Sequence, residues 1–154
     1  MPVVGRPFRF DRSWRFGVGR EALWQVLART DDFPRWWTWL RRFEPGDGLV
    51  DGSVARCVVR PPLPYVLRFD VAVEHVVPAE LVETTVSGDI EGPARLELSG
   101  DGDRAEARLV WEVDLRDPLL RTVARVGRPL MEWGHGWVVD TGVEQFRRRA
   151  LDGA

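Results

Sequence analysis

The fold is decided by the stretch Ala105–Leu115, which reads AEARLVWEVDL, and by the residues from Asp117 to Leu151 that follow it. Apolar residues alternate from Leu109 onwards, so the first stretch predicts a strand with one buried face. The residues after Asp117 carry apolar side chains at helical spacing, which predicts a long C-terminal helix. A helix that crosses the face of a twisted antiparallel sheet holds two apolar surfaces apart. We therefore expect a space between the sheet and the helix.

Towards the N-terminus, the sequence predicts one strand and two short helices. Phe8–Phe16 alternates apolar and polar residues, as a half-buried strand does. The first helix is expected over 21–29, and Asp31 or Asp32 caps a second helix that ends near Leu40. Dense Gly and Pro residues then divide the chain into short strands. These strands are predicted over 53–60, 65–74, 81–89, 94–98 and 105–115.

Two of these strands bear on the interior. The alternation over 65–74 places one set of residues on a buried face, namely Tyr65, Leu67, Phe69, Val71 and Val73. The register of the strand over 81–89 stays open, because a shift by one residue exchanges its two faces. The inward set is either Glu83, Thr85 and Ser87 or Val82, Thr84 and Val86. Gly92-Pro93 predicts a turn before the next strand.

The order of these elements predicts an α+β fold. We expect a curved antiparallel sheet of about seven strands, in the order β-α-α-β6-α, wrapped around a long C-terminal helix with an internal cavity. The 154 residues suffice for one domain with a single core, and the sequence shows no repeat and no linker. We therefore assign residues 1–154 to a single domain. Gly127-Arg128-Pro129 is expected to kink or break the C-terminal helix.

Three glycines stand inside the last part of the predicted helix. Gly134, Gly136 and Gly142 each cost about 1 kcal/mol relative to alanine in a helix. Either another element approaches the backbone closely there, or side chains are absent so that a space remains. We favour the space, and the alternative is close packing against the bulky indoles.

Composition excludes several classes of partner. A net charge of −2 gives no long-range attraction for nucleic acid. No apolar run approaches the roughly 20 residues of a membrane span, and charged residues over 6–15 interrupt any signal-peptide pattern. We expect a cytoplasmic protein, and a homodimer stays open. His75 and His135 lie far apart and Cys57 stands alone, which matches no zinc spacing, and no nucleotide-binding motif is present. We therefore expect neither a metal nor a cofactor.

The chain resembles the START-like, helix-grip superfamily, also called SRPBCC, and within it the polyketide cyclase/dehydrase and lipid-transport group. The resemblance covers nearly the whole chain and rests on the order of elements and on local sequence. The matching text is Phe33-Pro34-Arg35-Trp36-Trp37, the stretch Val86–Gly92, and Trp133-Gly134-His135 followed by Gly142. The resemblance implies a deep apolar cavity that takes up lipids, polyketides, sterols or aromatic compounds. It carries over no catalytic residue, because the superfamily shares none.

Several residues are candidates for the site. The expected cavity lining is Trp37, Tyr65, Leu67, Phe69, Leu96, Leu98, Trp111, Met131, Gly134, His135 and Val138. His135 and Tyr65 are the catalytic candidates, since an imidazole near its neutral pKa can act as an acid or base. The alternative for His135 is a structural role at the cavity edge. The basic run 147–149 is expected to be a solvated cap at the negative end of the helix dipole.

Three functions follow from this interpretation. The first is binding of a hydrophobic or aromatic small molecule in the cavity. The second is a polyketide cyclase or dehydratase that uses His135 or Tyr65 as acid or base. The third is a partner-binding module whose interface is the cluster Trp36, Trp37 and Trp39, on condition that these indoles are exposed. The eight tryptophans are the outlier of the composition.

Overall fold

The computed structural model describes residues 8–37, 39–60, 66–100, 102–115 and 136–151. Seven strands form one antiparallel sheet in the order β1-β7-β6-β5-β4-β3-β2. They are β1 (Phe8–Phe16), β2 (Leu40–Glu44), β3 (Val54–Val59), β4 (Leu67–Val77), β5 (Leu81–Gly88), β6 (Ile90–Ser99) and β7 (Ala105–Leu115). The predicted sheet is therefore confirmed.

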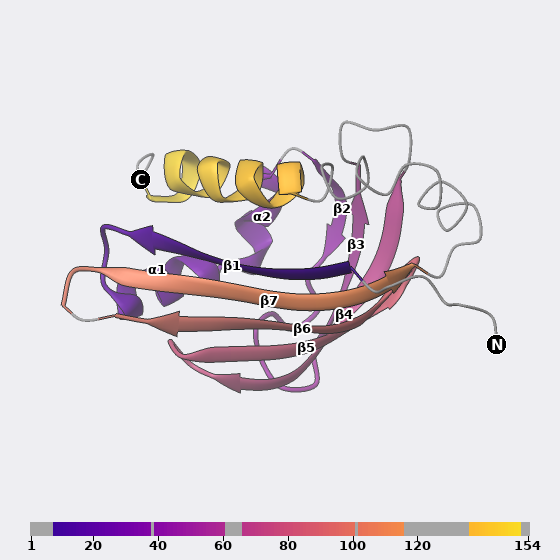
Figure 1. Cartoon of the computed structure of the whole chain (residues 1–154), viewed down its shortest axis with the longest axis horizontal. Helices are drawn as coiled ribbons and strands as arrows, with labels where there is room; N and C mark the ends of the chain where they lie inside the picture. Colours follow the sequence, from indigo (N-terminus) through magenta and orange to yellow (C-terminus); the bar gives the residue numbers. More distant parts are fainter. Residues whose placement is uncertain (1–7, 38, 61–65, 101, 116–135, 152–154) are drawn as a thin grey trace.

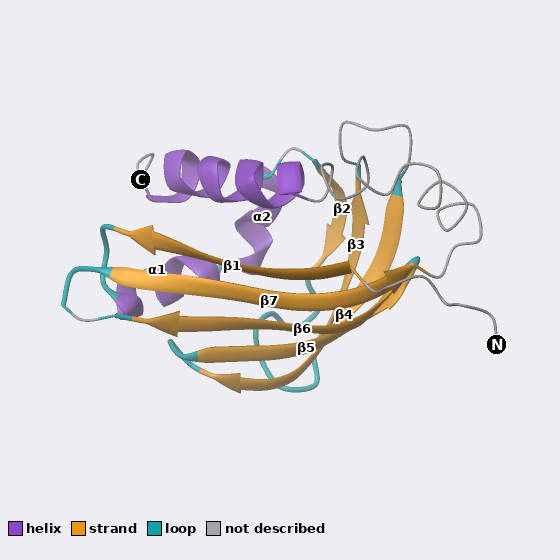
Figure 2. Ribbon diagram, in the orientation of Figure 1, coloured by secondary structure: helices purple, strands orange, loops and turns teal. Residues whose placement is uncertain are grey.

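The helices lie on the inner face of this sheet. Between β1 and β2 come α1 (Arg20–Leu27), the 3-10 turn η1 (Thr30–Asp32) and α2 (Phe33–Trp36). The C-terminal helix occupies residues 136–146 and continues as the π-helical turn η2 (Arg147–Leu151). The sheet is strongly curved, and the C-terminal helix crosses its open side with α2 beside it (Figures 1 and 2). The helix predicted over 117–135, with its break at 127–129, lies outside the described residues.

One strand was missed by the sequence analysis. The second short helix ends at Trp36 rather than near Leu40, and Leu40 begins β2. The strand has five residues and includes two consecutive arginines, so it shows little alternation. Its identity as a strand comes from pairing with β3, in which Phe43 lies opposite Cys57. Tertiary pairing thus decides this segment, as it often does where local preference is weak.

The turn predicted at Gly92-Pro93 is wrong, because β6 runs straight through these residues. The chain reverses earlier, at Gly88, which has φ +134° and where a Cβ would lie 2.7 Å from the Arg68 carbonyl oxygen. The Asp89 carboxylate then accepts a 2.8 Å hydrogen bond from the Arg68 N–H. Pro93 has no N–H to give, and the pairing of β6 with β7 passes from Glu91 directly to Ala94.

A packed core occupies one end of the sheet. Leu23 of α1 is 0% exposed there, and Phe146 of the C-terminal helix packs edge-on against both Phe16 and Trp36, with ring centroids 5.8 and 5.2 Å apart. We call this cluster the packed end. Its buried members are Phe16, Leu23, Trp24, Trp36, Val73, Ala79, Val82, Leu98, Ala105, Ala107 and Phe146.

The basic run after the helix is more than the predicted solvated cap. The Arg147 guanidinium donates a 2.5 Å hydrogen bond to the Arg15 carbonyl and stacks 4.8 Å over the Phe16 ring. Arg149 donates to the carbonyl of Trp36 at 3.0 Å, at the C-terminal end of α2. Cations favour such carbonyl ends of helices. These two arginines therefore fasten the end of the chain to β1 and α2.

The outer face of the sheet carries paired charges. Arg108 of β7 donates two hydrogen bonds, of 2.9 and 2.7 Å, to Asp11 of β1, and its guanidinium also lies 3.5 Å from Glu97 of β6. The hydrogen bond from Arg108 lowers the pKa of Asp11 below its usual value. A face of this kind is solvated, so the apolar interior lies on the opposite, helix-covered face.

Candidate functional site

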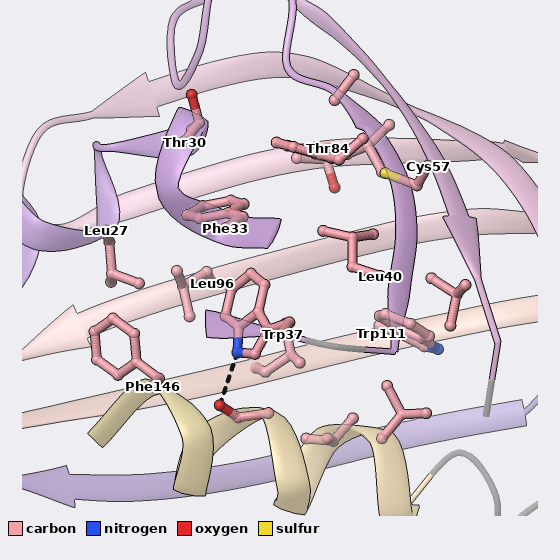
Figure 3. Close-up of a pocket in the computed structure, with 18 of the residues that line it drawn as sticks. Leu27, Thr30, Phe33, Trp37, Leu40, Cys57, Thr84, Leu96, Trp111 and Phe146 are labelled. Carbon is pink, nitrogen blue, oxygen red and sulfur yellow. Dashed lines mark hydrogen bonds between the residues drawn. The ribbon is translucent and has the colours of Figure 1, made fainter. Parts of the chain in front are cut away.

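A cavity of about 430 Å³ lies between the sheet and the C-terminal helix. Every strand contributes to its wall, and the helix side adds Val138, Val139, Gly142, Val143 and Phe146. The alternation predicted for β4 is confirmed, because Leu67, Phe69, Val71 and Val73 all line this space. We call this region the hollow end. Five buried residues of the packed end also border the cavity, namely Phe16, Leu23, Val73, Ala107 and Phe146. Figure 3 shows its walls converging from β2, α2 and the C-terminal helix.

Aromatic rings make up a large part of the wall. The lining includes Trp14, Phe16, Phe33, Trp37, Trp39, Phe43, Phe69, Trp111 and Phe146. Trp37 stacks on Trp39, with ring centroids 5.5 Å apart and planes 21° apart, and touches Phe33 at 4.6 Å. Aromatic pairs in such offset arrangements add stability beyond the area that they bury. The resulting wall presents flat apolar faces to the cavity.

The indole of Trp37 also bonds to the helix that covers the cavity. Its Nε1–H donates a 2.8 Å hydrogen bond to the Gly142 carbonyl, drawn as a dashed line in Figure 3. A Cβ at Gly142 would lie 3.1 Å from Cζ2 of Trp39. Gly142 is therefore explained by close packing against the indoles, and our preference for a space at this residue was wrong. Among the described residues, a Cβ at Gly136 would meet only Arg12, at an ordinary 3.6 Å.

The lining holds few polar side chains among the residues that the structure describes. Thr30 and Thr84 contribute hydroxyls, Cys57 contributes a thiol, and the remaining side chains are apolar or indole. Burial, followed by the nearby charge of Asp70, raises the pKa of Cys57 to about 12. The thiol is therefore protonated at neutral pH, and no described lining side chain is ionised there.

The open register of β5 is settled by the structure. Val82 and Val86 are buried, at 5% and 3% exposure, and Thr84 between them lines the cavity. The opposite face turns outward, where the hydroxyl of Thr85 bonds to the Glu74 carboxylate. Both candidate sets contain a threonine at the central position, but valines flank Thr84 whereas Glu83 and Ser87 flank Thr85, and this difference in polarity was the available signal.

The predicted site residues fall into three groups. The first group lines the cavity and comprises Trp37, Leu67, Phe69, Leu96, Trp111 and Val138. The second is Leu98, which is 5% exposed within the packed end and outside the cavity wall. The third lies outside the described residues and comprises Tyr65, Met131, Gly134 and His135.

Sequence reasoning missed several wall residues. Ala55, Cys57 and Val59 alternate along β3 and all line the cavity. That period-two pattern was a usable signal. It was missed because the sequence analysis predicted a strand here but did not assign its buried face. Trp39 follows α2. Its place in the wall depends on the path of the backbone after that helix, which the sequence does not reveal. The described residues include no cluster of three or more metal-binding side chains.

Comparisons with known proteins bear on the fold. No family model matches the sequence, and no curated protein matches it. Among solved structures, a protein from Thermus thermophilus is similar with a TM-score of 0.80, over 96% of this chain and 99% of the other, at 11% identity. A START superfamily protein from Mycobacterium smegmatis gives a TM-score of 0.72, over 95% and 99%, at 13% identity. An aromatase/cyclase from a Streptomyces species gives 0.64, over 96% and 99%, at 13% identity.

These similarities establish the class of fold. The chain has the START-like, helix-grip fold, in which a curved antiparallel sheet grips a C-terminal helix. The expectation from the sequence resemblance is confirmed at this level. In the part of the chain that the structure describes, no helix is long and apolar enough to cross a bilayer.

Proposed function

We propose that this protein binds a hydrophobic, predominantly aromatic small molecule in the cavity at the hollow end. The observation that carries the proposal is the cavity itself, with its apolar and aromatic wall. Ligand sites in proteins are concave, mostly apolar and roughly 300–1,000 Å³ in volume, and about 430 Å³ falls within that range. An apolar cavity of about 150 Å³ holds one benzene, so this one accommodates about three rings.

The partner-binding alternative loses its support. Trp36 is 4% exposed within the packed end, and Trp37 and Trp39 line the cavity. The tryptophan cluster therefore turns towards the packed end and the cavity, and its indoles are buried or half-buried. The cyclase or dehydratase alternative depends on Tyr65 and His135, which lie outside the described residues. Among the described lining, Cys57 is the ionisable group, and at a pKa of about 12 it is no base at neutral pH.

Binding is tested with Nile red, an uncharged dye whose emission rises in apolar surroundings. The expected result is saturable binding to the wild-type chain, with one dye per chain by native mass spectrometry. Val71→Trp places an indole in the cavity and should weaken dye binding at least about tenfold, since the added side chain occupies ligand volume.

The matched control is Ala72→Trp. Ala72 is the next residue of β4, and the alternation of the strand turns it to the outer face. Dye binding should be unchanged in this variant. A wild-type chain that binds neither dye nor any compound from a lipid extract would overturn the proposal, as would equal binding by the two tryptophan variants when both are folded.

A further inference from the structure

Thr84 places one hydroxyl in the apolar wall that the sheet contributes. It lies in β5 between the buried residues Val82 and Val86, and it lines the cavity. Figure 3 shows its oxygen among the apolar side chains of the wall. A hydroxyl at this position is costly unless its hydrogen-bonding capacity is used. What it can offer to a ligand depends on the bond that it already makes.

The hydrogen of this hydroxyl is committed to the sheet. Thr84 Oγ1 donates a 2.9 Å hydrogen bond to the carbonyl oxygen of Ala94. Ala94 lies directly opposite Thr84 in β6, so the register of the two strands fixes this bond. A hydroxyl has one hydrogen to donate and two lone pairs to accept with. Because a carbonyl cannot donate in return, Thr84 presents only an acceptor to the cavity.

Charged side chains lie on the other face of the same strand, which is solvated. Thr85 turns outward and bonds to Glu74 on the solvated side of the sheet. Within the described lining, the thiol of Cys57 is the titratable group, and it is neutral. An ionised group moved from water into such a wall loses its hydration without gaining a counter-charge.

We propose that the ligand is an uncharged aromatic molecule that carries a hydroxyl or N–H group, and that this group donates a hydrogen bond to Thr84 Oγ1. The inference rests on the proposed function and adds the chemistry of the ligand. A phenol or an aromatic amine fits this description. A ketone or an ether lacks the required hydrogen, and a carboxylate carries a charge that the wall does not balance.

Three naphthalenes with the same ring system separate these ligands. They are 2-naphthol, 2-methoxynaphthalene and 2-naphthoate, each used to displace Nile red at pH 7. A neutral hydrogen bond is worth roughly 0.5–1.5 kcal/mol, so 2-naphthol should bind about three- to tenfold more tightly than the ether. The carboxylate should bind at least about 100-fold more weakly than 2-naphthol.

Substitutions then assign the effect to Thr84. Thr84→Val keeps the shape of the side chain and removes the acceptor, so the preference for 2-naphthol over the ether should fall to about onefold. Thr84→Ser keeps the hydroxyl and should retain the preference. Thr85→Val on the outer face is the matched control, and it should behave as wild type.

The outcomes distinguish the two proposals. If Nile red binds and is displaced equally well by the alcohol and the ether, or if Thr84→Val retains the preference, the role of Thr84 is overturned and the container function stands. Tight binding of 2-naphthoate would overturn the requirement for an uncharged ligand. Absence of binding by Nile red and all three naphthalenes overturns the proposed function together with this inference.

Discussion

The packed end and the hollow end are built from the same sheet and the same helix, and they differ in what fills the space between them. At the packed end, Trp36, Val82 and Leu98 are almost fully buried, belong to one cluster and lie outside the cavity wall. At the hollow end, Leu67, Phe69 and Trp111 are only partly buried, since they face the cavity. Similar side chains thus hold the fold together at one end and surround a space at the other.

The difference follows from what lies under each part of the helix. α1 and α2 insert their apolar side chains beneath the C-terminal end, and Arg147 and Arg149 fasten that end to β1 and α2. The stretch around Val138 has no such helix beneath it in the described chain. Trp37 and Gly142 mark the boundary, where the indole meets the helix backbone.

The largest effect that we expect concerns the chemistry of Cys57 at the hollow end. Its pKa of about 12 leaves the thiolate fraction at pH 8 roughly 1,000-fold below that of a thiol at the ordinary value of 9.0. N-ethylmaleimide should therefore alkylate the folded chain about 1,000-fold more slowly than the chain in urea. Equal rates, measured by mass spectrometry, would show that the thiol is not buried.

The same shift predicts a dependence of stability on pH. The folded chain holds the thiol proton more tightly than the unfolded chain does. The free energy of unfolding should therefore fall as pH rises from about 9, the unfolded value, towards 12. Below pH 9 this contribution is fully present, and Cys57→Ala should remove the alkaline decline that the thiol causes.

A pair of leucines compares the two ends directly. Leu98→Ala removes a buried side chain, 5% exposed, from the packed end and outside the cavity wall, and should lower the free energy of unfolding by about 3 kcal/mol. Leu67→Ala enlarges a space that already exists and should cost about 1 kcal/mol. Urea unfolding measures both. Losses of equal size would mean that the hollow end is as tightly packed as the other.

The smallest effect concerns the boundary between the two ends. Gly136→Ala should stabilise the helix by up to about 1 kcal/mol, because its new methyl group has ordinary contacts. Gly142→Ala should bring no such gain, since the methyl group must displace the ring of Trp39. A shift in tryptophan emission should accompany the second substitution only. Equal stabilisation by both variants, without that shift, would argue for free space at Gly142.

The sequence predicted most where periodicity is strong. The alternation of β4 placed Leu67 and Phe69 on the cavity wall before any backbone was known. The same reasoning missed β2, whose arginines obscure its pattern. It also placed a turn at Gly92-Pro93, where the pairing with β5 keeps the strand extended. Local residue types could not reveal partners that lie on other strands.

In the cavity wall, too, some features could be predicted from the sequence and others depended on tertiary packing. The inward face of β5 depended on register, and the role of Gly142 depended on where the indole of Trp39 lies. Both are properties of tertiary packing. The expected roles of Tyr65 and His135 stay predictions, because these residues lie outside the described chain.

The hydrogen bond from Thr84 to the Ala94 carbonyl also matters for the protein without a ligand. The hydroxyl hydrogen bonds to the sheet itself. Arg147 and Arg149 anchor the helix through backbone carbonyls of β1 and α2. The hydroxyl hydrogen of Thr84 is therefore satisfied whether or not a ligand occupies the cavity. A ligand of the kind proposed would then add to the stability of the folded chain, since it binds that state alone.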